Sequence, residues 1–149
     1  MRIKAITIGG FKNLKRSRLQ LDNTTIIASP NNYGKSNLLE AINFGVEFIK
    51  AKSKDRKSMM RWVKGIPINS ELENDEFFFE IEFENQNLTE YRFGKYGFTF
   101  SWYKDDKSGQ KITGEWIEAR ANESVRYTSF LKREAGLYRK EKIHLLLEK

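Results

Sequence analysis

The most regular hydrophobic pattern in the chain is a strict alternation over residues 76–84. Phe77, Phe79, Ile81 and Phe83 alternate with glutamates, namely Glu80, Glu82 and Glu84. Because successive strand side chains point to opposite faces, this segment predicts a half-buried antiparallel strand. Residues 88–93 and 98–103 alternate too, and Gly94 to Gly97 between them predict a hairpin turn.

The alternating texture continues toward the C-terminus. Residues 104–109 carry a second turn signal, after which Ile112, Trp116 and Ile117 indicate a strand. Another strand is predicted near 125–131, while the apolar residues of 134–149 fit a helix or a strand. The second half of the chain is therefore predicted to be an antiparallel β-meander.

The first half has a different pattern. Residues 2–8 alternate and predict a strand with Ile3, Ala5 and Thr7 on one face, ended by Gly9 and Gly10. A short alternating segment at 17–21 predicts a second strand. Residues 24–28 are β-branched and apolar on both faces, which is typical of a strand buried on both sides.

The clearest helix is predicted over residues 36–50. Its apolar positions recur at steps of three and four residues and form one stripe: Leu38, Leu39, Ile42, Val46 and Ile49. Gly45 lies inside the pattern, where it lowers helix propensity but allows close approach to a sheet. Residues 51–75 are predicted to be a polar connection with a short helical piece around 59–63.

Composition narrows the class of protein. The 149 residues are 39% hydrophobic and 13% aromatic, which argues against intrinsic disorder. No apolar run is long enough to span a membrane, and the chain has no cysteine, which suits the cytoplasm. His144 is the single histidine, so a multi-histidine metal site is excluded.

The net charge of +7 is unevenly distributed. Residues 2–18 and 50–64 are strongly basic, whereas residues 71–90 are acidic. A basic surface favours polyanions such as nucleotides or nucleic acid. Solvated surface lysines in an ordinary soluble protein remain the simpler interpretation for most of these charges.

Residues 29–36 carry the candidate chemistry. They approach the phosphate-loop pattern G-x-x-x-x-G-K-S/T, with Gly34, Lys35 and Ser36 in the last three positions and Ser29 in place of the first glycine. In this pattern backbone N–H groups wrap phosphates, the lysine reaches the β- and γ-phosphates, and the hydroxyl holds Mg²⁺. The predicted strand before the loop and helix after it favour this interpretation over an ordinary strand-to-helix turn.

Further segments extend the likeness beyond the loop: Phe11-Lys12-Asn13, Pro30-Asn31-Asn32, and Asn37-Leu38-Leu39-Glu40-Ala41-Ile42. With them the first third of the chain resembles the N-terminus of the ABC-type chromosome-maintenance, RecF and overcoming-lysogenization-defect (OLD) ATPases, a group with AAA-like ATP binding. The resemblance implies that seven residues surround the nucleotide: Asn31, Asn32, Tyr33, Gly34, Lys35, Ser36 and Asn37. It also implies that Ser36 ligates Mg²⁺ and that residues 11–13 lie near the base.

The resemblance implies an α/β fold, the P-loop NTPase half-domain called lobe I in ABC and chromosome-maintenance ATPases, with an antiparallel β-meander subdomain. Residues 1–50 would form the strand, P-loop and helix core, 51–75 the polar connection, and 76–149 the β subdomain. The chain would then be part of a longer protein. That protein would bind ATP and Mg²⁺, dimerise through its ATP-binding domain, and act on DNA in repair or phage defence.

No catalytic residue is identifiable in the sequence. Glu80 ends an apolar run as a catalytic acid would, but it continues the alternation into Glu82 and Glu84. Ser108-Gly109-Gln110 fits a turn better than a signature motif. The full-length protein is therefore expected to hydrolyse ATP, whereas residues 1–149 alone are expected to be inactive.

Alternative functions remain open. Ser29 leaves room for a non-hydrolysing nucleotide- or nucleic-acid-binding module, and a small P-loop kinase is disfavoured because the meander is the wrong continuation. Five aromatic residues could form a base-stacking sheet face, but a packed core explains their alternation more simply: Tyr91, Phe93, Phe98, Phe100 and Trp102.

Overall fold

The computed structural model describes residues 1–28, 34–61, 76–102, 112–134 and 137–140. These residues form seven strands and two helices: β1 (Arg2–Phe11), β2 (Leu14–Gln20), α1 (Lys35–Lys50), α2 (Ser53–Met59), β3 (Glu76–Glu84), β4 (Phe93–Ser101), β5 (Ile112–Arg120), β6 (Thr128–Glu134) and β7 (Leu137–Lys140). The strands make one sheet in the order β2-β1-β3-β4-β5-β6-β7, with every pairing antiparallel. The predicted β-meander is confirmed over β3 to β7, and β1 joins the first half of the chain to the same sheet.

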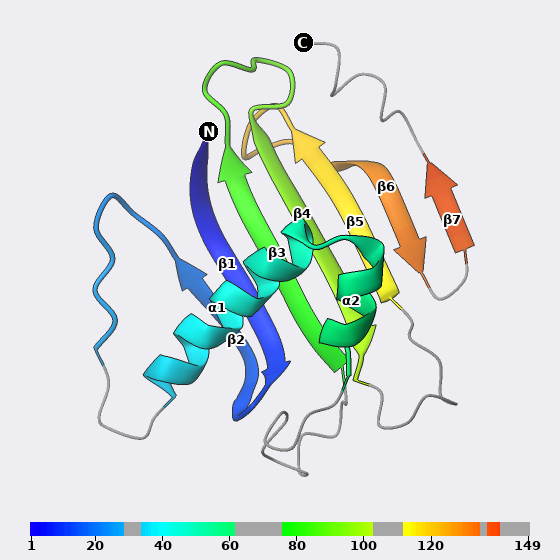
Figure 1. Ribbon diagram of the computed structural model, residues 1–149. Helices are drawn as coiled ribbons and strands as arrows, with labels where there is room; N and C mark the ends of the chain where they lie inside the picture. The colour runs from blue at the N-terminus through cyan, green and yellow to red at the C-terminus, as the bar shows by residue number, and fades with distance from the viewer. Residues whose placement is uncertain (29–33, 62–75, 103–111, 135–136, 141–149) are drawn as a thin grey trace.

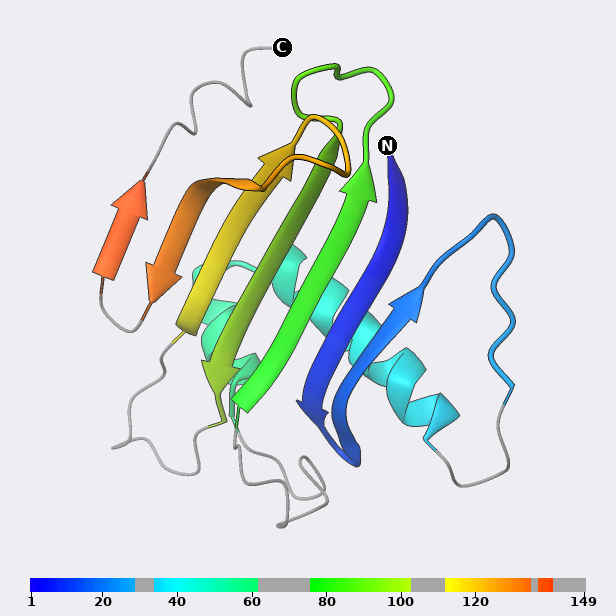
Figure 2. The same ribbon diagram turned by 180° about the vertical axis from the view of Figure 1, so that it is seen from behind.

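Both helices cover one face of the sheet, and no helix among the described residues covers the opposite face (Figures 1 and 2). The core lies between α1 and the aromatic rows of β3 and β4, where Phe77 pairs with Phe100 and Phe79 with Phe98. All four rings are buried. Phe48 of α1 stacks on Phe98 with 4.6 Å between ring centroids. Because flat rings bury a large apolar area, this cluster supplies much of the driving force for folding.

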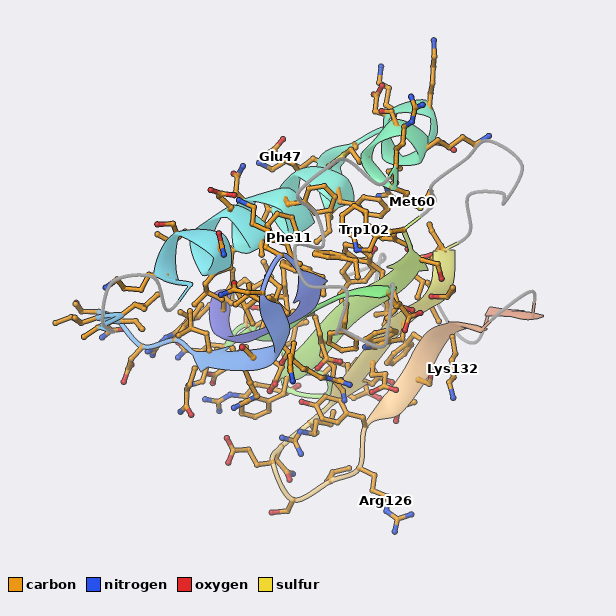
Figure 3. All side chains as sticks on the ribbon, turned by 90° about the horizontal axis from the view of Figure 1, so that it is seen from below. Phe11, Glu47, Met60, Trp102, Arg126 and Lys132 are labelled. Carbon is orange, nitrogen blue, oxygen red and sulfur yellow. The ribbon has the colours of Figure 1, made fainter. Side chains whose placement is uncertain are left out.

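Figure 3 shows the molecule from below, with the helix layer on one side of the sheet. Phe11 and Trp102 lie between the helix layer and the sheet, whereas Arg126 and Lys132 project on the opposite side. The Trp102 indole N–H donates to the Gly10 carbonyl oxygen at 2.9 Å, which satisfies its polar group inside the core. The structure thus confirms the core interpretation for Phe98, Phe100 and Trp102. Phe93 is only half-buried, on the helix-free face.

The predicted helix is confirmed, and four residues of its predicted stripe pack partly buried against the core: Leu38, Ile42, Val46 and Ile49. Ala41, Gly45 and Phe48 are the buried residues, whereas Leu39 is 58% exposed. A Cβ on Gly45 would lie 2.2 Å from a ring carbon of Phe79. Ala41 and Gly45 therefore determine how close α1 lies to the sheet, because their small size lets the helix axis approach a layer of bulky rings.

The hairpin predicted at residues 94–97 is wrong. Gly94 and Gly97 lie inside β4, and residues between β3 and β4 make the turn instead. A Cβ on Gly94 would come within 2.4 Å of the Phe83 ring, and one on Gly97 within 2.2 Å of the Trp116 ring. These glycines make room for cross-strand aromatic rings and do not reverse the chain.

The N-terminal strand also differs from its prediction. β1 continues through Gly9 and Gly10 to Phe11, and its core-facing residues are Ile6 and Ile8. Ile3 is 40% exposed, and a register shift separates it from Ala5. Gly10 has φ +67°, and a Cβ there would lie 1.8 Å from the Glu76 carbonyl oxygen. Glycine therefore allows β1 to pass close to β3 where another residue would end the pairing.

The predicted buried strand at residues 24–28 is also wrong. These residues are not in a strand, and Ile26 is 86% exposed. Figures 1 and 2 show the chain running away from the sheet after β2. A strand needs a neighbouring backbone to satisfy its N–H and C=O groups, and the described strands place none beside this segment.

The remaining predictions concern the connection and the C-terminal half. The short helix is Ser53–Met59, earlier in the chain than predicted. The strands expected at 112–117 and near 125–131 are confirmed as β5 and β6. The turn predicted at 104–109 lies outside the described residues, as does most of 134–149. Within the described part of the chain, neither helix is long and apolar enough to cross a bilayer.

Candidate phosphate-binding site

The N-terminus of α1 carries the candidate site. Gly34 caps the helix with φ 92° and ψ 15°, a left-handed conformation that favours glycine. Lys35 and Ser36 then form the first turn, and the Leu38 N–H donates to the Gly34 carbonyl oxygen at 2.8 Å. The glycine of the Gly-Lys-Ser sequence is thus used for the sharp change of direction with which the helix begins.

This helix end suits an anion electrostatically. The first N–H groups of any helix have no partner within the helix, and the peptide dipoles leave partial positive charge there. No acidic residue occurs in the first turn, and the N-cap residue, Gly34, has no side chain with which to cap it. The nearest acid along the helix, Glu40, forms an ion pair with Lys12. Phosphate oxygens would therefore meet donors and little repulsion.

The turn between β1 and β2 packs against this helix end. Asn37 donates its side-chain amide to the Asn13 Oδ1 at 2.7 Å. Lys12 itself has φ 51°, so the tight turn places it in the left-handed region. Phe11 is 3% exposed and packs on Phe44 with 5.6 Å between centroids. Its ring therefore lies in the core. The expectation that residues 11–13 lie near the base stays a prediction.

Of the seven predicted nucleotide residues, the structure places four together. Gly34, Lys35, Ser36 and Asn37 are consecutive at the start of α1. Asn31, Asn32 and Tyr33 lie outside the described residues, and so does Ser29. Sequence reasoning missed the partnership of Asn37 with Asn13, because nothing in the pattern indicated that a hairpin turn would meet a helix start.

The glutamates of β3 have partners on the helix-free face. Glu80 accepts from the Trp116 indole N–H at 2.7 Å, and Glu82 accepts from the Arg18 guanidinium at 2.9 Å. The Arg92 guanidinium donates to Glu84 and holds the pKa of that carboxyl below its usual value. Among the described residues no acidic or histidine cluster could hold a metal ion. The interpretation of Glu80 as a strand residue in a regular alternation is confirmed.

A cavity of about 440 Å³ lies at the other end of α1, lined in part by Arg56, Lys57 and Glu115. Arg56 donates to the Phe48 and Ile49 carbonyl oxygens at 2.8 and 2.7 Å, so it caps the helix C-terminus. Glu115 accepts from the Tyr96 hydroxyl at 3.0 Å, and burial together with this carboxylate raises the pKa of Tyr96. Arg56 therefore stabilises the end of α1, and Glu115 joins β5 to the Tyr96 side chain of β4.

Gly34, Lys35 and Ser36 at the start of α1 match the last three positions of the phosphate-loop pattern, whereas residues 24–28 do not form the strand that the pattern expects before the loop. Comparison with protein-family models gives the class of protein. The family model described as "AAA ATPase domain" matches residues 1–148. The chain belongs to the AAA ATPase domain family. Comparison with curated proteins gave no match.

Proposed function

We propose that this chain binds Mg·ATP through residues 31–37, as the N-terminal lobe of a cytoplasmic ABC-type ATPase of the RecF, chromosome-maintenance or OLD kind. The observation that carries the proposal is the left-handed Gly34 at the start of α1, directly before Lys35 and Ser36. Membership of an ATPase domain family supports it. In the longer protein, ATP would hold two such domains together, and the output would act on DNA in repair or phage defence.

Each residue has a separate part in binding. The backbone N–H groups at the start of α1 would donate to phosphate oxygens, and the Lys35 ammonium would neutralise the β- and γ-phosphates. The Ser36 hydroxyl would hold Mg²⁺, whose charge offsets that of the phosphates. Ser36 is exposed, so its hydroxyl is accessible to a ligand at the helix end.

The test is calorimetric titration of the 149-residue chain with ATP, with and without Mg²⁺. We expect Ser36→Ala to weaken Mg·ATP binding by about tenfold, because a ligand to a charged group is lost, and to weaken Mg-free ATP binding much less. Ser53→Ala is the matched control, since Ser53 begins α2 without a phosphate-loop sequence. Absence of ATP binding by the wild-type chain would overturn the proposal.

A non-hydrolysing binding module is the second candidate. The partners of Glu80, Glu82 and Glu84 favour it for this chain taken alone, since these acids are engaged in the sheet. Positioning of water and stabilisation of the transferring phosphoryl group give most of the acceleration in phosphoryl transfer.

We therefore expect the purified chain to bind ATP but to release phosphate at the rate of the buffer blank. Phosphate release would be followed with Lys35→Ala as the control for contaminating enzymes. Turnover that Lys35→Ala abolishes would show that the chain carries its own catalytic acid.

A further inference from the structure

We propose that Asn13 is a positioning residue for the phosphate site, acting through its hydrogen bond to Asn37. The inference rests on the proposed function and extends it to a residue outside the loop. It assigns residues 11–13 to a clasp, defined as the last residue of β1 and the β1–β2 turn, which together hold the N-terminal half of α1. Such a clasp ties the helix end that meets phosphate to the first strand of the sheet.

The contacts of the clasp run antiparallel to the helix, one residue at a time. Phe11 packs on Phe44, and Lys12 pairs with Glu40. Asn13 then accepts from Asn37 at 2.7 Å. The helix positions 37, 40 and 44 are three and four residues apart, so they lie on one face of α1. The three consecutive residues of the clasp thus contact three successive positions of a single helical stripe.

Asn13 also lies against the glycine that begins the helix. A Cβ on Gly34 would be 3.1 Å from the Asn13 Oδ1 and 3.2 Å from its Nδ2. Gly34 can adopt many conformations because it has no side chain. A neighbour packed on its open side restricts that freedom. Of the four residues at the candidate site, Asn13 therefore accepts a hydrogen bond from Asn37 and lies beside Gly34.

The three contacts of the clasp differ in their distance from the phosphates. Phe11 and Lys12 act on the second and third turns of α1, where every N–H group already has a helical partner. Only Asn13 reaches the first turn, whose N–H groups are those available to a ligand. Loss of Lys12 or Phe11 should therefore change stability, while loss of Asn13 should change the geometry offered to phosphate.

In a positioning role, Asn13 holds the start of α1 in its binding arrangement before any ligand binds. Binding is tighter when donors are already held in the bound arrangement, because less conformational entropy is lost on association. A side-chain hydrogen bond between exposed residues contributes little to global stability. The expected signature is weaker nucleotide binding with an almost unchanged melting temperature.

The experiment is a double-mutant cycle with Mg·ATP affinity as the readout. Asn13→Ala should raise the Kd by about threefold to tenfold, and it should have a clearly smaller effect in the Asn37→Ala background, because the hydrogen bond is already absent. Asn122→Ala is the matched control, since Asn122 is an exposed turn residue that also accepts one hydrogen bond, from the Ser124 N–H at 3.0 Å. Its Kd should equal that of the wild type.

Hydrogen exchange of the ligand-free chain provides a readout that does not depend on nucleotide. Asn13→Ala should raise exchange at residues 34–40 and leave β3 and β4 unchanged. An unchanged Kd, or equal effects of Asn13→Ala in both backgrounds, would overturn the role of Asn13 while leaving ATP binding intact. A wild-type chain that binds no ATP would instead overturn the proposed function. Unchanged exchange at 34–40 would overturn the clasp itself.

Discussion

Replacement of Lys35 by alanine is expected to weaken Mg·ATP binding by between about tenfold and a hundredfold, because a charge-assisted contact to the phosphates is lost. Lys35 is the first residue of α1, so its ammonium adds to the partial positive charge of the helix end. The measurement is calorimetry at fixed Mg²⁺ and moderate ionic strength. The effect should diminish at high salt, where exposed charges are screened.

Lys50→Ala is the matched control for this prediction. Lys50 lies in the last turn of the same helix and pairs with Glu47 at 3.1 Å. Its removal takes away the same charge and the same side chain far from the candidate site. Equal affinity of Lys35→Ala and Lys50→Ala would show that the lysine of the Gly-Lys-Ser sequence has no specific contact with ATP.

The sequence was most informative where one periodicity extended over a whole element. The glutamate and phenylalanine alternation of residues 76–84 predicted β3 with its observed limits, because Phe77 and Phe79 face the core while the glutamates face the side without helices. The stripe of α1 likewise predicted the helix to within one residue. In both elements the side that packs on the core is apolar. The order of apolar and polar residues therefore predicts the element directly.

Glycines were the main source of error in the fold. Gly94 and Gly97 have the spacing of a turn, and Gly9 and Gly10 that of a strand end. In the structure each stands where a neighbouring ring or backbone leaves no room for a side chain. A close approach across strands depends on residues distant in the sequence, so local pattern cannot distinguish it from a turn.

Residues 24–28 show a second limit. Their composition is typical of a buried parallel strand, but a strand forms only where other backbone is available to pair with it. The observed edge of the sheet is β2, and this segment leaves it. The composition of residues 24–28 thus predicted a strand buried on both faces, but none of the described strands pairs with this segment.

The candidate site was predicted in part for a similar reason. Gly34, Lys35 and Ser36 are contiguous, so a local pattern identifies them. Asn13 is separated from Asn37 by a strand and a loop, and it reaches the site only because β1 and β2 form a hairpin beside α1. Residues that position a site from another element become visible only once the packing is known.

The packing of α1 leads to the second large prediction, on the stability of the chain. Gly45→Ala should lower the free energy of unfolding by about 2 kcal/mol, although alanine has the higher helix propensity by about 1 kcal/mol. The new methyl group would lie 2.2 Å from a ring carbon of Phe79, which is fully buried and cannot move aside. The measurement is chemical denaturation followed by circular dichroism.

Asn43→Ala is the control for helix propensity, because Asn43 is an exposed position of the same helix. It should be neutral or slightly stabilising, since alanine favours helix and contacts nothing new. Phe79→Leu should make room for the methyl group, so Gly45→Ala should cost less in that background than in the wild type. If Gly45→Ala instead raised stability as Asn43→Ala does, α1 would stand farther from β3 than the structure places it. The close packing of α1 on β3 would then not be available to fix the position of the clasp and the phosphate site.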